Sequence, residues 1–399
     1  MQLDQQILTL VKEFEEDIIF LRRKIHENPE LGFAEYQTAE LIASKLKDLG
    51  LEVQAGVGGT GVVGYLDCGL ERTIALRADM DALPVLEETG LEFASKNKGI
   101  MHACGHDAHT AMVLGSAMVL STLKDILKVN VKFVFQPCEE TPPGGALAMI
   151  KDGVLDSPEV EAIFGIHVSP DLPVGTVAVS KGAQMAASDK FTLIIKGMGG
   201  HGAVPNEAVD SIVIAAEVVQ ALQTIVSRKT DPLKPVVVTV GMIKGGHKGN
   251  VIAEKVEMEG TIRTFYPDLR SKVPAWIEQV VKGITSAHNA TCQLEMVTGR
   301  PPLINSCELV PLVENSAAQI VGRSKVVPQK PTMVGEDFAH YLEKIPGVYF
   351  YLGCNDGNKQ YFCHHPRFDI SEKVLGIGSA VLAQVACSYP HMTRREEDI

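Results

Sequence analysis

The sequence predicts an α/β protein whose mainly parallel sheet is interrupted by an inserted α+β unit. Short apolar strands alternate with helices over the first 186 residues, as in parallel sheets that are covered on both faces. Across residues 187–297 the order becomes strand, helix, strand, strand, helix, strand, which is typical of a ferredoxin-like unit. We therefore predict a discontinuous main domain, residues 1–186 and 298–399, and an inserted domain, residues 187–297.

Apolar residues at helical spacing predict the helices, and short apolar runs predict the strands. The first helix ends before Pro29, and Gly50 is placed to cap the second. The predicted helices are Gln5–His26, Thr38–Leu49, Ala108–Leu120, Asp210–Val226, Leu269–His288, Glu308–Val321, Phe338–Lys344 and Lys373–Tyr389. The predicted strands are Val62–Leu66, Thr73–Arg77, Val131–Gln136, Ala162–Val168, Phe191–Lys196, Val236–Ile243, Lys255–Thr264, Thr291–Val297 and Val348–Gly353. We expect the charged tail from His391 to Ile399 to be frayed.

Composition limits the partners. The chain has 399 residues, 45% of them hydrophobic, and a net charge of −12, which argues against a nucleic-acid partner. It has no run of 18 apolar residues and no signal-peptide pattern at its start, so we expect no membrane partner. The eight cysteines are scattered, which favours reduced thiols in the cytoplasm.

The stretch from Met101 to Thr110 concentrates residues that bind metals or carry protons: Cys104, His106, Asp107 and His109. Gly105 lets a turn aim the flanking thiolate and imidazole at one point. The start of the following helix would favour a thiolate at Cys104. Cys-Gly-His alone is equally compatible with a helix start that binds no ion.

Further candidate ligands lie at or just beyond the ends of predicted strands, where chemistry collects in parallel sheets. The candidate ligands come from four segments, which hold Cys104 and His106, Glu139 and Glu140, His167, and His364 or His365, and Asp79 and Asp81 also lie at a predicted strand end. Such a set suits one or two divalent ions of the Zn, Mn, Co or Ni type, with one of the adjacent glutamates left as a general base. Taken singly, a glutamate pair is usually solvated surface, a strand histidine usually belongs to the core, and His-His-Pro is usually a turn.

The ordered motifs resemble the amidohydrolase branch of the aminoacylase and carboxypeptidase metallopeptidase family. That branch includes hippurate hydrolase, N-acyl-L-amino acid amidohydrolase, N-acetyldiaminopimelate deacetylase, indoleacetyl-amino acid hydrolase and thermostable carboxypeptidase. The motifs are Arg22–Leu31, Leu76–Pro84, Met101–Asp107, Phe135–Glu140, Gly165–Val168, Gly199–Gly202, Gly260–Thr264, Gly335–Phe338 and His364–Pro366. The resemblance implies a zinc-peptidase-like catalytic domain and an inserted lid and dimerisation domain. It also implies a homodimer or a dimer-based tetramer.

The resemblance also implies a role for individual residues. The metal ligands it implies are Cys104, His106, Glu140, His167 and His364, with Cys104 bridging two ions. Glu139 falls at the general-base position, and Asp81 resembles the aspartate that orients a ligand histidine. His201 matches a lid histidine that stabilises an oxyanion, in its own or a neighbouring subunit, whereas His365 has no ligand role. The substrate carboxylate would be bound by Asn250 and Arg263.

The predicted reaction is hydrolysis of the amide bond of an N-acyl L-amino acid, with an acetyl, benzoyl or aminoacyl group. One ion would polarise the acyl carbonyl, and a metal-bound water would lose a proton to Glu139 and attack as hydroxide. A metallo-carboxypeptidase or dipeptidase acting on short peptides is the alternative. Two further alternatives are a hydrolase with Cys104 as nucleophile and His106 or His109 as base, and a non-catalytic protein that binds metal or peptide.

Overall fold

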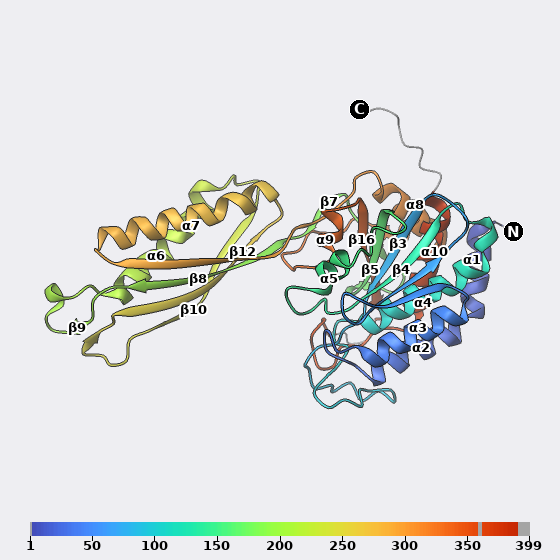
Figure 1. Cartoon of the computed structure of the whole chain (residues 1–399), viewed down its shortest axis with the longest axis horizontal. Helices are drawn as coiled ribbons and strands as arrows, with labels where there is room; N and C mark the ends of the chain where they lie inside the picture. Colours follow the sequence, from blue (N-terminus) through green and yellow to red (C-terminus); the bar gives the residue numbers. More distant parts are fainter. Residues whose placement is uncertain (1, 358–360, 390–399) are drawn as a thin grey trace. The chain divides into compact units, whose positions relative to one another are not determined.

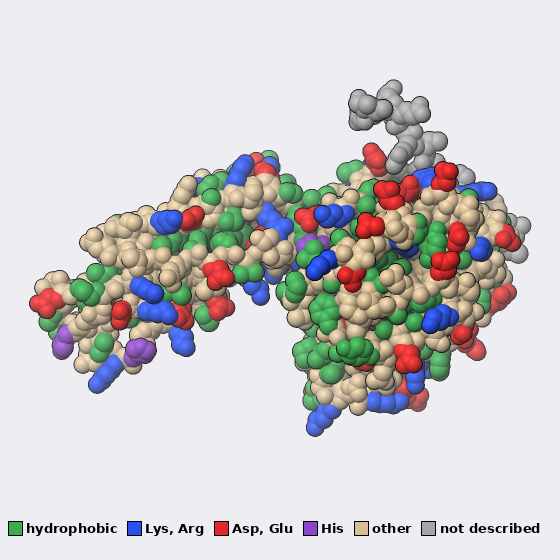
Figure 2. Space-filling model, viewed as in Figure 1, with side chains coloured by type: hydrophobic (Ala, Val, Ile, Leu, Met, Phe, Trp, Pro, Cys, Tyr) green, Lys and Arg blue, Asp and Glu red, His purple; other side chains and the backbone are tan. Residues whose placement is uncertain are grey.

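A computed structural model describes residues 2–357 and 361–389. The charged tail that we expected to be frayed lies outside these residues. The described chain forms two compact units. Unit 1 comprises the described residues of Met1–Gly182, Ile304–Lys330 and His340–Ile399, and unit 2 comprises Ala183–Leu303 and Pro331–Ala339. On the face shown in Figure 2, acidic and basic side chains are interspersed.

Unit 1 is built on an eight-stranded sheet with the order β1-β2-β4-β3-β5-β16-β6-β15 (Figure 1). The strands are β1 Glu52–Val57, β2 Gly61–Leu66, β3 Thr73–Asp79, β4 Asn130–Gln136, β5 Val160–Pro173, β6 Val177–Ala178, β15 Val326–Val327 and β16 Gly347–Asn355. The four central strands, β4, β3, β5 and β16, run parallel. β1 and β2 are antiparallel additions at one edge, and β6 is antiparallel to β16. This confirms the predicted fold class.

The strands that the sequence predicts are those of the sheet's interior. Every residue of β3 and β4 is buried, so their apolar runs are almost unbroken. The sequence does not predict β1, because most of this edge strand is exposed and its residues are mixed in polarity. The two-residue strands β6 and β15 are likewise not predicted, because they are too short to form a pattern.

The helices of unit 1 are α1 Leu3–Glu13, α2 Glu15–Glu27, α3 Tyr36–Asp48, α4 His106–Thr122, α5 Gly145–Lys151, α8 Val310–Val321 and α10 Lys373–Ser388. α4 is buried along its first fifteen residues and packs closely on α10. A Cβ atom at Gly115 would lie 2.3 Å from Ser379 Oγ, and one at Gly378 would lie 1.9 Å from Met112 Sδ. Only glycine at these two positions permits the helices to approach so closely.

The predicted helix Gln5–His26 is wrong as a single helix, because it is interrupted at Phe14, whose backbone has φ −93° and ψ 1°. Three acidic residues, Glu15, Glu16 and Asp17, follow the interruption and form the first turn of α2. Acidic side chains are favoured at a helix N-terminus, which explains why a new helix begins there.

Unit 2 has the βαββαβ order that the sequence predicts. Its elements are β8 Ala187–Lys196, α6 Ser211–Thr224, β10 Val236–Gly245, β12 Lys255–Thr264, α7 Pro267–Ala287 and β13 Thr291–Arg300. The sheet order is β10-β12-β8-β13, and all neighbours are antiparallel. Buried residues alternate along β8, so one face of the sheet packs on the two helices. A separate two-stranded ribbon pairs β9 Gly200–His201 with β11 Val251–Ile252.

The remaining elements are short. They are β7 Gly182–Met185, β14 Leu303–Asn305, α9 Ala339–Leu342, the 3-10 turns Lys124–Ile126, Pro205–Glu207 and Arg323–Lys325, and a π turn Ile225–Lys229 that continues α6. The segment Pro331–Ala339 belongs to unit 2, whereas the predicted boundaries leave it in the main domain. The reason is hydrogen bonding: the Ala186 amide donates to the carbonyls of Thr332 and Val334, and Arg300 donates to the carbonyl of Gly335.

One helical stretch, Ser211–Lys229, is long and apolar enough by composition to cross a membrane, with a mean hydropathy of 1.2. Buried helices of a protein core pass the same test. Here Ile214, Val218 and Leu222 belong to the hydrophobic core of unit 2.

Candidate metal centre

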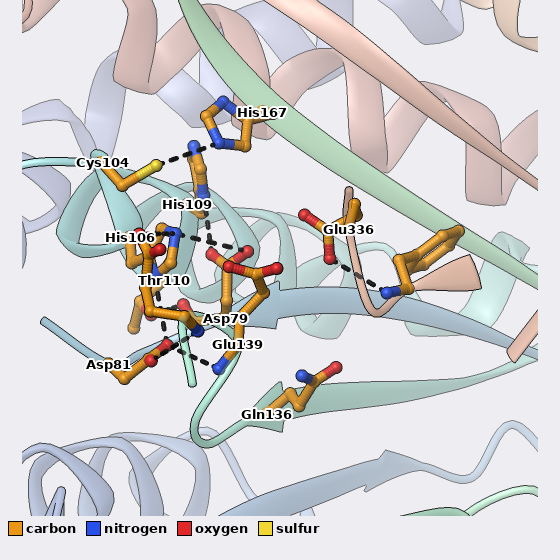
Figure 3. A network of polar contacts seen from close by, with 12 residues as sticks. Asp79, Asp81, Cys104, His106, His109, Thr110, Gln136, Glu139, His167 and Glu336 are labelled. Carbon is orange, nitrogen blue, oxygen red and sulfur yellow. Dashed lines mark hydrogen bonds and ion pairs between the residues drawn. The ribbon is translucent and has the colours of Figure 1, made fainter. Parts of the chain in front are cut away.

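The predicted metal-binding segments of unit 1 meet at the carboxyl ends of its parallel strands (Figure 3). Asp79 ends β3, and Asp81 follows it. Glu139 and Glu140 follow β4, and His167 lies within β5. Cys104 and His106 lie at the start of α4, which packs on β3. The sheet register therefore brings together residues that are separated in sequence.

The ligand atoms form two overlapping groups, in each of which all atoms lie within 4.8 Å of one another. The first contains Cys104, His106 and His167, and the second contains Cys104, Glu140 and His364. Cys104 Sγ lies 3.5 Å from His167 Nε2, and His364 Nε2 lies 3.3 Å from Glu140 Oε1. The thiol of Cys104 is thus common to two sets of three donors.

His106 presents one ring nitrogen to the cluster. Its Nδ1 donates to Asp81 Oδ1 at 3.2 Å, and its buried Nε2 has no hydrogen-bond partner among the described residues. The nearest carboxylate atoms to this Nε2 belong to Asp79, at 3.8 Å, and Glu140, at 3.9 Å. Burial lowers the pKa of His106, but Asp79 and Asp81 outweigh burial and raise it well above its usual value. The pocket is therefore strongly cation-attracting.

Asp81 also fixes the loop that carries the two glutamates. The amide of Glu139 donates to Asp81 Oδ1 and that of Glu140 to Asp81 Oδ2, both at 3.0 Å. One buried carboxylate thus orients a histidine and two consecutive loop residues. Carboxylates in this position commonly set the orientation of a metal-binding imidazole.

The hydrogen bonds of His167 and His109 fix the tautomers of these two histidines. His167 Nδ1 donates to the carbonyl of Val168 at 2.7 Å, so Nε2 carries the lone pair that faces Cys104. Burial and the neighbouring His109 lower the pKa of His167 and keep it neutral. His109 Nδ1 donates to Asp79 Oδ1 at 2.7 Å, and its Nε2 accepts from the Val168 amide at 3.0 Å. Both nitrogens of His109 are engaged, so it has none left to act as a base for Cys104.

Cys363, which the sequence analysis did not single out, is the main cause of a raised pKa at the Cys104 thiol. Burial and the carboxylates of Glu140 and Glu139 raise this pKa further. We expected the start of α4 to favour a thiolate at Cys104, and these neighbours outweigh that effect. The signal for Cys363 was its position next to a predicted ligand, His364.

The loop that carries His364 is anchored to the turn before α4. The amide of His364 donates to the carbonyl of Ala103 at 2.7 Å, and its φ of +70° is unusual for a histidine. The Glu140 carboxylate, which accepts a hydrogen bond from the His364 ring, raises the pKa of His364. His365 belongs to neither group, and instead stacks on Tyr361 with ring centroids 4.3 Å apart.

Unit 2 holds the three remaining predicted residues, but not in one place. His201 pairs with Val251, and the Gly202 amide donates to the carbonyl of Asn250 at 2.9 Å, so His201 and Asn250 are neighbours. Arg263 lies eight steps along β12 from Lys255, the residue nearest that ribbon. At about 3.3 Å per residue, Arg263 lies roughly 26 Å from Lys255 along the strand. One small ligand therefore cannot contact both His201 and Arg263 of the same unit 2.

Comparison with known proteins decides the family. Residues 75–388 match the description "Peptidase family M20/M25/M40". The chain belongs to this family. The relatives named below align with almost the whole length of this chain.

The chain is similar to "Thermostable carboxypeptidase 2" of Saccharolobus solfataricus, with 41% identity over 98% of this chain and 99% of that protein. It is also similar to "N-acetyl-L-cysteine deacetylase" of Bacillus subtilis, with 42% identity over 92% of this chain and 89% of that protein. Among solved structures, the YXEP protein of Bacillus subtilis, described as a dinuclear metal-binding peptidase of the M20 family, has a TM-score of 0.83. It is 37% identical and covers 94% of this chain and 98% of its own.

As a member of peptidase family M20/M25/M40, the chain is a metal-dependent hydrolase that acts on linear amides or peptide bonds. The clustered donors of unit 1 are suited to divalent metal ions. The identity of the chain as a family member thus agrees with the resemblance in its sequence motifs.

The Gly105→Ala variant is expected to be destabilised by about 2–5 kcal/mol. Gly105 has φ +85°, and its missing Cβ would lie 2.5 Å from Val168 Cγ2. The left-handed backbone costs about 1–2 kcal/mol for alanine and overpacking about 1–3 kcal/mol. Gly50→Ala is the matched control, because Gly50 has φ +76° with nothing within 4 Å, and it should cost only about 1 kcal/mol. Urea unfolding of both variants after chelation measures the difference, and equal losses would contradict the steric argument.

Proposed function

We propose that this chain is an amidohydrolase that cleaves the amide bond of N-acyl L-amino acids, using two divalent cations of the Zn, Mn, Co or Ni type. The proposed ligands are Cys104, His106, Glu140, His167 and His364. The observation that carries the proposal is the pair of three-donor groups that share Cys104. Cys104 would be a donor common to both groups.

The chemistry of the donors supports this assignment. His106 has a buried Nε2 without a hydrogen bond among the described residues, while its Nδ1 is oriented by Asp81. His167 is oriented in the same way by a backbone carbonyl. Metal-binding histidines have this pattern, in which one nitrogen is fixed and the other faces the ion. Imidazole, thiolate and carboxylate together favour Zn and its neighbours over Mg or Ca.

We assign a residue of this chain to each proton transfer and to the oxyanion of the proposed reaction. When bound, a pair of divalent cations polarises the acyl carbonyl and makes water acidic near neutral pH. Glu139 lies in a group with His106 and Glu140 whose ligand atoms are within 4.8 Å of one another, and its backbone is held by Asp81. We assign Glu139 to take the proton of the attacking water and deliver it to the leaving amine. His201 would donate to the oxyanion of the tetrahedral intermediate.

We further propose that the chain works as a homodimer or a dimer-based tetramer. His201 and Asn250 are neighbours, whereas Arg263 lies roughly 26 Å along β12 from Lys255, the strand residue nearest to their ribbon in sequence. If His201 and Arg263 both serve catalysis, they therefore serve different sites. A second copy whose ribbon supplies His201 and Asn250 would satisfy this requirement, with Arg263 acting on a substrate carboxylate.

A metallo-carboxypeptidase acting on short peptides is a second candidate, supported by the 41% identity to a protein named thermostable carboxypeptidase. A cysteine nucleophile is a third, because the lone pair of His167 Nε2 lies 3.5 Å from Cys104 Sγ. The base would then be His167, not His106 or His109 as the sequence analysis supposed. This third candidate leaves Glu140 and His364 without a role.

Chelation is expected to remove all hydrolytic activity, and Mn, Co, Zn or Ni is expected to restore it. The assay is hydrolysis of N-acetyl, N-benzoyl and benzyloxycarbonyl-blocked amino acids and of dipeptides, each tested with each cation. Faster hydrolysis of dipeptides than of every N-acyl amino acid would favour the carboxypeptidase candidate. Activity that survives chelation but is lost on thiol alkylation would establish the cysteine nucleophile instead. A protein that turns over none of these substrates with any cation would be a binding protein.

A further inference from the structure

Carboxylates hold three consecutive backbone amides in the loop that carries the proposed base. The amides of Glu139 and Glu140 donate to Asp81, as described above. The amide just before them, that of Cys138, donates to Glu35 Oε1 at 2.8 Å. Asp81 follows β3, whereas Glu35 comes from the loop before α3, so two separate segments fix the same loop. No part of the proposed chemistry uses Glu35.

Glu35 is a fully buried carboxyl group, with 0% of the residue exposed. Its second oxygen accepts a hydrogen bond from the hydroxyl of Thr60. Burial raises the pKa of Glu35, and the hydrogen bonds from Thr60 and Cys138 only partly offset this effect. A polar group is rarely placed in such a position unless its hydrogen bonds are needed. Here they join Thr60, at the end of the β1–β2 turn, to the loop after β4.

The loop requires such support because its backbone is in an unfavourable conformation. Cys138 has φ +49°, in the left-handed region that a cysteine seldom adopts. The loop is also tightly packed, since a Cβ atom at Gly32 would lie 2.6 Å from Cys138 Sγ. Gly32 and Glu35 belong to the same short segment between α2 and α3. This segment therefore contacts the loop both sterically and by a hydrogen bond.

We propose that Glu35 is a positioning residue for Glu139, acting through the hydrogen bond that its carboxylate accepts from the Cys138 amide. The inference rests on the proposed function, in which Glu139 is the general base. Loss of this bond releases the left-handed turn at Cys138, so that the Glu139 carboxylate occupies its reactive position for less of the time. Asp81 still holds the amides of Glu139 and Glu140, so cation binding through Glu140 is retained.

The test compares Glu35→Met, which keeps the volume but accepts no strong hydrogen bond, with Glu35→Gln, which keeps an acceptor oxygen. Glu35→Met is expected to lower kcat about 10- to 100-fold with KM and cation content unchanged, as for a misplaced catalytic group. Glu35→Gln is expected to stay within about threefold of the wild type, because the Thr60 hydroxyl can accept from its amide nitrogen. Glu30→Met is the matched control. The Glu30 carboxylate likewise accepts backbone amides, those of Gln37 and Thr38, but does not touch the loop.

A second measurement does not depend on catalysis. Hydrogen exchange of the peptide spanning residues 137–145 is expected to be faster in Glu35→Met than in the wild type, Glu35→Gln or Glu30→Met. Unchanged exchange and kcat in Glu35→Met would overturn the inference, as would equal losses of kcat in the Met and Gln variants. If the wild-type protein hydrolyses no substrate, the proposed function fails, and the exchange rates alone then decide whether Glu35 holds the loop.

Discussion

Replacing Glu139 by glutamine is expected to lower kcat about 100- to 10,000-fold while the protein keeps its full complement of cations. Glutamine has the same size and leaves the backbone bond from residue 139 to Asp81 in place. What it cannot do is accept the proton of water and return it to the leaving amine. Because Glu139 is buried, with 5% of the residue exposed, bulk solvent is a poor substitute for the missing base.

The control for this prediction is the next residue along the chain. Glu140 belongs to the group with Cys104 and His364, so Glu140→Gln is expected to lower cation content and activity together. Cation content measured by atomic spectroscopy, alongside kcat and KM, separates the two variants. A Glu139→Gln protein that retained cations and more than a tenth of the wild-type kcat would show that the base is another residue.

Replacing Arg22 by methionine is expected to lower the free energy of unfolding by about 3–5 kcal/mol, the cost of breaking a buried ion pair. The Arg22 side chain is 2% exposed, and its Nε donates to Asp107 Oδ2 at 2.7 Å. Its other nitrogens pair with Asp369, at 2.9 Å, and with Glu372, at 3.4 Å. Methionine fills similar space but leaves these acids without their shared cation. Arg23→Met is the control, because Arg23 pairs with the same Glu372 at 47% exposure and should cost at most about 1 kcal/mol.

The effect of Arg22 should depend on pH. Burial alone would raise the pKa of Asp107, but Arg22 and His26 outweigh it and hold that pKa far below its usual range. The ion pair therefore adds stability above the unfolded pKa of about 4, and this stability is lost as the pH falls further. Urea unfolding of the wild type and Arg22→Met between pH 7 and pH 3 should show a difference that shrinks below about pH 4. A difference that is constant over this range would mean that the cost of the variant is one of packing.

The candidate metal donors could be selected from the sequence because they have recognisable residue types at or near the ends of apolar strands. Cys104, His106, Glu140, His167 and His364 were chosen on these grounds and on a family resemblance, and the structure brings their ligand atoms together. Parallel pairing of β3, β4 and β5 explains why, since it aligns strand ends that are distant in sequence.

The residues that support the donors were harder to find, because their signals are not local. Glu35 precedes a helix and Cys363 precedes a histidine, and neither position has a pattern that distinguishes it from ordinary surface. Their roles follow from contacts across roughly a hundred residues or more, such as that between Glu35 and Cys138. The position of His201 beside Asn250 was likewise invisible, because it depends on the pairing of two strands of only two residues each, β9 and β11.

The first turn of α4 gives the protein little freedom to evolve there. In this turn His106 belongs to the proposed cation site, whereas the next residue, Asp107, belongs to the buried ion-pair network. A substitution that adjusts one of these neighbours also disturbs the other, so selection on reactivity and selection on folding act on the same few codons. Changes in substrate preference are accordingly expected to accumulate elsewhere, in exposed segments such as His247–Asn250, where few buried partners constrain the choice of side chain.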